Sequence, residues 1–238
     1  MSIKTTLILQ TLMIISLSNY GQTTLKIPSE FIETTPPKND SDEHHTLNHS
    51  RKEFSVKNIN GVLEIQKAIY ERNCEFKLSN GKLIGENHGE WGGKLTFQPS
   101  DTTQKIVEIK EGNIKFIFKL KDKIYFMEGL AHLGTSEGTL YELDKKNDSF
   151  TYKKLLDFDD APEAFALNQD RFLIATHSNF YVVKDLKKEV IFKDTFWDNL
   201  YPNSIAVFDD ENVFLGIRSG IVKLNLTTKT LKFYKNDK

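Results

Sequence analysis

A repeated pair of short strands joined by a tight turn constrains the fold of this chain more than any other sequence feature. The clearest copies begin at Arg171 and Val213, and looser copies begin at Lys82 and Lys123. Successive starts are 41, 48 and 42 residues apart. Regular spacing of this kind is typical of proteins in which each copy forms one small sheet that packs only on its neighbours.

Small residues align at the first turn of the two clearest copies. Placing Ala175 on Gly216 puts Asn179 on Gly220, so residues that tolerate tight or left-handed backbone fall where the hairpin turns. Alternating apolar and polar residues predict further strands between the copies, at 105–110, 114–120, 150–158, 164–167 and 204–208. With four strands per copy, we expect an all-β fold, a small β-propeller of four to five four-stranded blades. A β-sandwich or a stacked meander is the alternative.

The last copy stops after three strands, at Tyr234. Propellers often close when an N-terminal strand completes the last blade, which removes a free sheet edge. The segment Glu53–Leu78 offers such a strand. Within it, the pattern from Gly61 to Asn73 fits a helix face as well as strands, and we interpret it as two strands.

The phrase Asn212–Leu224 and the turn after it resemble the short propeller repeats of two-component-regulator sensors and of the wider quinoprotein and WD40-like propellers. The resemblance covers 172–192 and 213–234 well and the two earlier copies loosely. It implies a propeller fold and carries no catalytic residues across.

The N-terminal region has the three parts of a secretory signal peptide. Lys4 precedes an apolar stretch from Leu7 to Leu17, and small residues follow, with cleavage expected after Ser18 or, as second choice, Gly21. The stretch is shorter than the roughly 20 apolar residues that a membrane span needs. We therefore predict a signal peptide over 1–21, no membrane span, and export to the periplasm or secretion.

Residues 22–52 hold half of the six prolines and few apolar side chains after Ile32, which predicts a flexible tether before a propeller over 53–238. His44, His45 and His49 lie in this tether, where a His-rich tract binds metals weakly and without selectivity. The formal net charge of −1 argues against a nucleic-acid partner. The single cysteine, Cys74, excludes an internal disulfide, and we expect a buried thiol.

The most unusual local stretch runs from Glu86 to Gly93. Within eight residues it places three glycines and one tryptophan among polar side chains, and the candidate ligand-binding residues are Glu86, Asn87, His88, Glu90 and Trp91. Glycine lets a backbone approach a ligand, and tryptophan offers a flat stacking face, which suits a sugar or a peptide. A turn-forming glycine pair and a tryptophan packed between blades are the alternative.

His88, His132, His177 and Arg218 follow strands that we expect to line a central channel. Converging imidazoles can hold a metal or an anionic ligand. Alignment on the small residues superposes Asn87, His177 and Arg218 and leaves His88 one residue out of phase, so ordinary hydrogen-bonded histidines are the preferred interpretation. We keep His177 and Arg218 as candidate ligand-binding residues and assign no metal, cofactor or catalytic residue.

The sequence thus predicts an exported β-propeller that acts as a binding module. Its ligand would be a carbohydrate, a peptide or a protein. The alternative function is a propeller hydrolase or lyase with a metal held by channel histidines.

Overall fold

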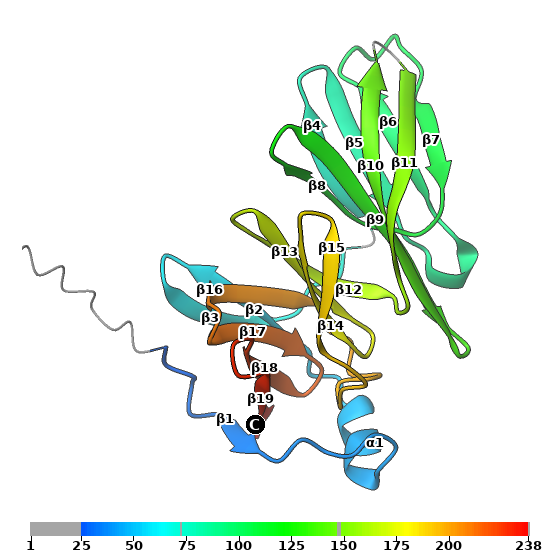
Figure 1. The fold of residues 1–238 in the computed structure, drawn as a ribbon. Coiled ribbons are helices and arrows are strands. Elements are labelled where there is room, and N and C mark those ends of the chain that lie inside the picture. The colour runs from blue at the N-terminus through cyan, green and yellow to red at the C-terminus, as the bar shows by residue number, and fades with distance from the viewer. Residues whose placement is uncertain (1–24, 72, 147–148, 238) are drawn as a thin grey trace, which may run out of the picture.

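The computed structural model describes residues 25–71, 73–146 and 149–237, which form mainly antiparallel β-strands (Figure 1). The first elements are β1 (Phe31–Thr34), α1 (Asp42–Asn48), β2 (Phe54–Ile59) and β3 (Val62–Lys67). They are followed by β4 (Asn73–Leu78), β5 (Gly81–Glu86), the 3₁₀ helix η1 (Gly89–Trp91), β6 (Lys94–Pro99), β7 (Val107–Glu111), β8 (Ile114–Leu120), β9 (Lys123–His132), β10 (Thr135–Lys146) and β11 (Ser149–Phe158). The last elements are β12 (Pro162–Asn168), β13 (Arg171–Thr176), β14 (Phe180–Lys184), β15 (Lys187–Phe192), β16 (Ser204–Asp209), β17 (Asn212–Ile217), β18 (Gly220–Asn225) and β19 (Thr230–Asn236).

The strands form five antiparallel sheets. Three of them contain four strands that follow one another in the chain, β4–β7, β8–β11 and β12–β15. A fourth sheet has the order β1-β19-β18-β17-β16, and the fifth is the hairpin β2–β3. The mostly β architecture of small antiparallel sheets predicted from the sequence is therefore confirmed.

In the four larger sheets, leaving β1 aside, the first strand precedes the start of the sequence repeat by one strand. The repeat starts at Lys82, Lys123, Arg171 and Val213 fall on β5, β9, β13 and β17, which are the second strands of their sheets. The most self-similar feature of the sequence is the tight central hairpin, such as the one that turns at Arg218 and Ser219 between β17 and β18. Aligning that hairpin therefore assigned the start of each repeat to a second strand rather than to the first strand of its sheet.

Four apolar clusters hold the sheets face to face in series. They lie between β4–β7 and β8–β11, between β8–β11 and β12–β15, between β12–β15 and the β16–β19 sheet, and between that sheet and β2–β3. In this order, representative buried side chains are Phe126, Phe172, Trp197 and Phe214. Among the described residues, no such cluster joins β2–β3 to β4–β7. The aromatic side chains of the sequence thus supply the contacts between successive sheets.

The described part of the expected tether is ordered and packs on the sheets, which corrects that prediction. Phe31 of β1 is buried, and its ring centroid lies 5.0 Å from that of Phe54 in an edge-on arrangement. Leu47 of α1 is 2% exposed within the cluster between β12–β15 and β16–β19. Ser41 caps the helix by accepting a hydrogen bond from the backbone N–H of His44 at 3.2 Å. A few apolar side chains are enough to order this segment because each one packs against a sheet that other strands form.

An N-terminal strand does pair with the last sheet, but it is not the expected one. β1 pairs with β19, and Phe31 lies opposite Asn236. The segment Glu53–Leu78 forms β2, β3 and β4 instead. The β16–β19 sheet has four strands of its own, so β1 is a fifth strand at its edge.

Only one of the two strands expected between Gly61 and Asn73 is present, as β3. After it, residues 68–71 form an irregular connection in which the side chain of Ile69 is 85% exposed. The predicted signal peptide over 1–21 lies outside the described residues. Among the described residues, no helix has the length and apolar character needed to cross a membrane.

Candidate functional site

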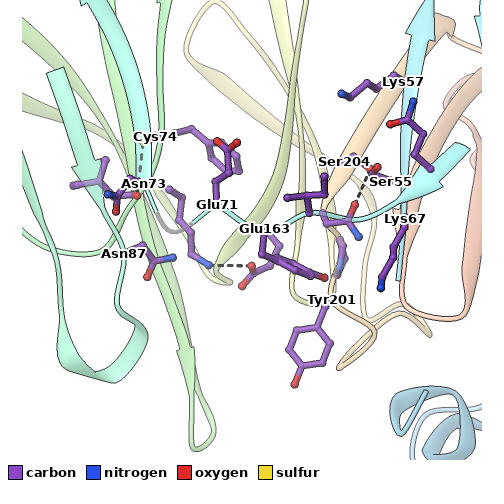
Figure 2. Close-up of a pocket in the computed structure, with 18 residues that line it drawn as sticks. Ser55, Lys57, Lys67, Glu71, Asn73, Cys74, Asn87, Glu163, Tyr201 and Ser204 are labelled. Carbon is purple, nitrogen blue, oxygen red and sulfur yellow. Dashed lines mark hydrogen bonds and ion pairs between the residues drawn. The ribbon is translucent and has the colours of Figure 1, made fainter. Parts of the chain in front are cut away.

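A cavity of about 450 Å³ lies where the first strands of the five sheets begin. Figure 2 shows the polar side chains that line it, with Ser55 of β2, Asn73 of β4 and Glu163 of β12 among them. Lys115 of β8 and Ser204 of β16 also belong to the lining. Each of these residues is the first or second of its strand, so the five sheets meet at this cavity.

Two connections complete the wall of the cavity. The segment between β3 and β4 contributes Ile69, Tyr70 and Glu71, and the segment before β16 contributes Tyr201, Pro202 and Asn203. Burial and a hydrogen bond to Glu53 raise the pKa of Tyr70, so its phenol stays protonated. The wall thus carries aromatic rings beside its amides, hydroxyls and charged groups.

A second cavity of about 520 Å³ adjoins the first. Both are lined by Asn87, Lys115 and Glu163, and the second adds His88 and Trp91. Gly89 and residues 129–131 of β9 complete its lining. Because the two cavities share three residues, we treat them as two halves of one central groove.

An ion pair marks the junction of the two halves. Lys115 Nζ lies 2.9 Å from Glu163 Oε2, and the two side chains are 17% and 20% exposed. They come from β8 and β12 and so bridge two successive sheets. An ammonium offers three hydrogen-bond donors and a carboxylate several acceptor sites, so the pair retains polar capacity toward the groove.

The loop that carries Trp91 is held by several hydrogen bonds. The backbone N–H of His88 donates to Gly92 O at 2.7 Å, and Asn113 Nδ2 donates to Gly89 O at 2.8 Å. Gly89 and Gly92 have φ values of +62° and +79°, a region that glycine enters without strain. The conformation of the loop therefore requires its glycines and is fixed by its own contacts.

Trp91 itself is 83% exposed and does not pack between sheets. Leaving a large aromatic side chain in water forgoes on the order of 3 kcal/mol of hydrophobic stabilisation. The neighbouring Glu90 forms an ion pair with His132, with Oε2 and Nε2 3.0 Å apart. This pair fastens η1 to the end of β9 and leaves the indole free at the rim of the groove.

Of the residues predicted from the Glu86–Gly93 stretch, the structure brings Asn87, His88 and Trp91 together in the groove. Glu86 ends β5 opposite Asn73 but is not part of the lining. Glu90 lies beside the groove and is engaged with His132.

His177 and Arg218 lie apart from the groove lining. His177 Nε2 is 2.7 Å from Asp198 Oδ1, and this hydrogen bond raises the pKa of the imidazole, although burial opposes the shift. Arg218 donates to Glu53 Oε1 and to the backbone oxygen and Oδ1 of Asn48. Both side chains are thus engaged by protein partners. All three residues follow second strands, but Asn87 lines the groove whereas His177 and Arg218 do not.

The part of the chain that the structure describes contains no group of three or more His, Cys, Asp or Glu side chains placed to hold a metal ion. The thiol of Cys74 lines the groove, and burial raises its pKa to about 11, which keeps it protonated at neutral pH.

Sequence reasoning missed Lys115 and Glu163. The available signal was the polar residue at the start of each first strand, as in Lys115 of β8, Glu163 of β12 and Ser204 of β16. An alignment of the repeats that started each copy one strand earlier would have superposed these polar residues.

No protein-family model matches the chain, and no curated protein shows significant similarity to it.

Proposed function

We propose that this chain is an exported β-propeller binding module that holds an extended polar ligand in the central groove. The observation that carries the proposal is the convergence of five first strands, whose polar residues line two adjoining cavities. A concave site with a few convergent polar groups is the usual form of a ligand site.

The series of sheets supports the propeller assignment. From β4–β7 onward, successive sheets pack face to face through their own apolar clusters, and each of the four larger sheets contains four consecutive strands, with β1 added at the edge of the last. This is how the blades of a propeller are arranged, with their first strands toward the centre. Export is supported by the charged start, apolar stretch and small residues at the N-terminus.

Binding fits the groove better than catalysis does. Lys115 and Glu163 neutralise each other, and the neighbouring amides of Asn73, Asn87 and Asn203 are hydrogen-bonding groups rather than acids, bases or nucleophiles. The alternative is a hydrolase or lyase with a metal held by channel histidines. It requires side chains to converge that here contact separate partners, as His132 contacts Glu90 and His177 contacts Asp198.

A substitution that fills the groove tests the proposal. Asn73 is exposed and lines the groove, and its side chain forms no hydrogen bond or ion pair with the described residues, so Asn73→Trp should occupy the groove and leave the fold intact. Lys77→Trp, on the same face of β4 but outside the groove, is the matched control. On glycan and peptide arrays, we expect Asn73→Trp to weaken the strongest signal at least tenfold and Lys77→Trp to leave it unchanged. Equal binding by both variants would place the ligand elsewhere.

A further inference from the structure

We infer that the ligand is a neutral glycan, whose sugar ring stacks on Trp91 while neighbouring hydroxyls of the same chain bind the Lys115–Glu163 pair. The inference rests on the proposed function and names the ligand class of the same groove.

The first argument is that Trp91 is exposed on a rigid loop. Its indole is 83% exposed, yet its loop is fixed by the His88–Gly92 and Asn113–Gly89 hydrogen bonds. A rigid, exposed aromatic face loses little conformational entropy when a ligand covers it. A sugar ring has apolar C–H faces bounded by hydroxyls, so it can cover the indole while its hydroxyls reach polar groups around it.

The second argument is the chemistry of the Lys115–Glu163 pair. Ammonium only donates hydrogen bonds and carboxylate only accepts them, whereas each sugar hydroxyl does both. With 2.9 Å between Nζ and Oε2, the pair presents a donor and an acceptor side by side, which matches two adjacent hydroxyls. Asn87 and His88 line the same half of the groove as this pair and Trp91, and they offer further hydrogen bonds.

The third argument is that the ion pair favours a ligand without charge. Both side chains are largely buried. A charged ligand group that captured one partner would leave the other buried and uncompensated, which is strongly unfavourable. A neutral polyhydroxyl ligand adds hydrogen bonds and leaves the pair intact.

A peptide fits the Trp91 half of the groove less well. Peptide recognition uses apolar pockets for alternate side chains or an exposed strand edge. Apart from Leu130 and Ala131, the lining of this half consists of polar residues, glycines and Trp91. A glycan is therefore the better chemical match.

The experiment uses titration calorimetry of the purified full chain with soluble neutral polysaccharides, with uronic-acid polymers and with the best peptides from an array. We expect a neutral polysaccharide to bind best. We also expect Trp91→Ala to weaken it at least tenfold, Trp91→Phe to weaken it less, and Glu163→Gln to weaken it several-fold. Ile106→Ala removes another solvent-exposed apolar side chain, 61% exposed and outside the groove, and should leave binding unchanged.

Melting temperatures keep the result interpretable, since Trp91→Ala should melt close to the parent chain. Tightest binding to a peptide or to a uronic-acid polymer would overturn the glycan inference and leave the proposed function standing. Unchanged affinity for the neutral polysaccharide in both Trp91→Ala and Glu163→Gln would also overturn it. If no ligand of any class binds, the proposed function itself fails.

Discussion

Arg218 reaches Glu53 across 165 residues of sequence and donates to a single carboxylate oxygen, Oε1, from both Nε at 2.8 Å and Nη2 at 2.5 Å. The guanidinium carbon also lies 4.2 Å from the ring centroid of Tyr201, a groove residue. Arg218 therefore fastens the segment before β2 to the β17–β18 turn and supports one wall of the groove without entering it.

We expect Arg218→Ala to destabilise the fold by about 2–4 kcal/mol, because it leaves a largely buried carboxylate without its partner. Arg171→Ala is the control, since its partner Asp210 is far more exposed and the loss should be about 1 kcal/mol or less. Urea denaturation of both variants measures the difference. An Arg218→Ala chain of unchanged stability that no longer binds ligand would restore the direct binding role predicted from the sequence.

His177 should make stability depend on pH near neutrality. The hydrogen bond to Asp198 raises the folded-state pKa of its imidazole, with smaller contributions from the charges of Asp160 and Glu163. The stabilisation is therefore fully present below the unfolded pKa of about 6.5 and is lost as the pH rises through the raised folded-state pKa. Urea midpoints from pH 5.5 to 8.5 should fall more steeply for the parent chain than for His177→Gln. The same profile for the two chains would contradict this, and the exposed His45→Gln serves as control.

Asp160 should make the fold sensitive to acid. Its carboxylate is 2% exposed, and burial alone would raise its pKa, but donors from Ser136, Thr176 and Ser178 outweigh burial and lower it. Its contribution is present above the unfolded pKa of about 3.9 and is lost as the pH falls through the lower folded-state pKa. We expect Asp160→Asn to cost about 2–4 kcal/mol at pH 7. The gap between parent and variant should narrow by pH 3 in denaturant titrations, and a gap that widens in acid would be inconsistent with this pKa shift.

Leu47→Ala tests whether the region before β2 belongs to the fold. A buried leucine replaced by alanine costs about 2–5 kcal/mol, whereas the same change in a flexible tether costs nothing. Thr46→Ala, at the neighbouring exposed position of α1, is the control and should change stability by less than about 1 kcal/mol. Thermal or urea unfolding that fails to separate the two variants would mean that α1 does not dock in solution.

Metal analysis of the purified chain addresses the enzyme alternative. We expect zinc, copper and calcium well below one ion per chain, because His132 and His177 are engaged with Glu90 and Asp198 in separate places. Near-stoichiometric metal that is lost in His177→Ala would instead favour the hydrolase or lyase.

Local sequence information was sufficient for most of the strands after β2 and for the hairpins that join them. The strand expected at 114–120 coincides with β8, and those expected at 150–158 and 204–208 differ from β11 and β16 by one residue. Alternating side chains and turn residues act between neighbours in the chain, so they can be interpreted without the fold.

Contacts between distant segments were not predictable in this way. The sequence around Phe31 and Leu47 is polar, and only docking on β19 and on the sheets beside α1 makes burial of these two side chains favourable. The Lys115–Glu163 pair depends on the rotation of one sheet against the next, which no local pattern encodes. The exposure of Trp91 likewise follows from how η1 is fastened, since a tryptophan beside two glycines suits a packed turn equally well.

The pairing of β1 with β19 has a consequence for the order in which the chain assembles. Phe31 is synthesised long before its partner Asn236, which lies far along the chain. Contacts between residues so far apart in sequence form slowly, because a long loop must close first. β1 therefore stays unpaired until β19 is made, and its docking follows the synthesis of every strand between them.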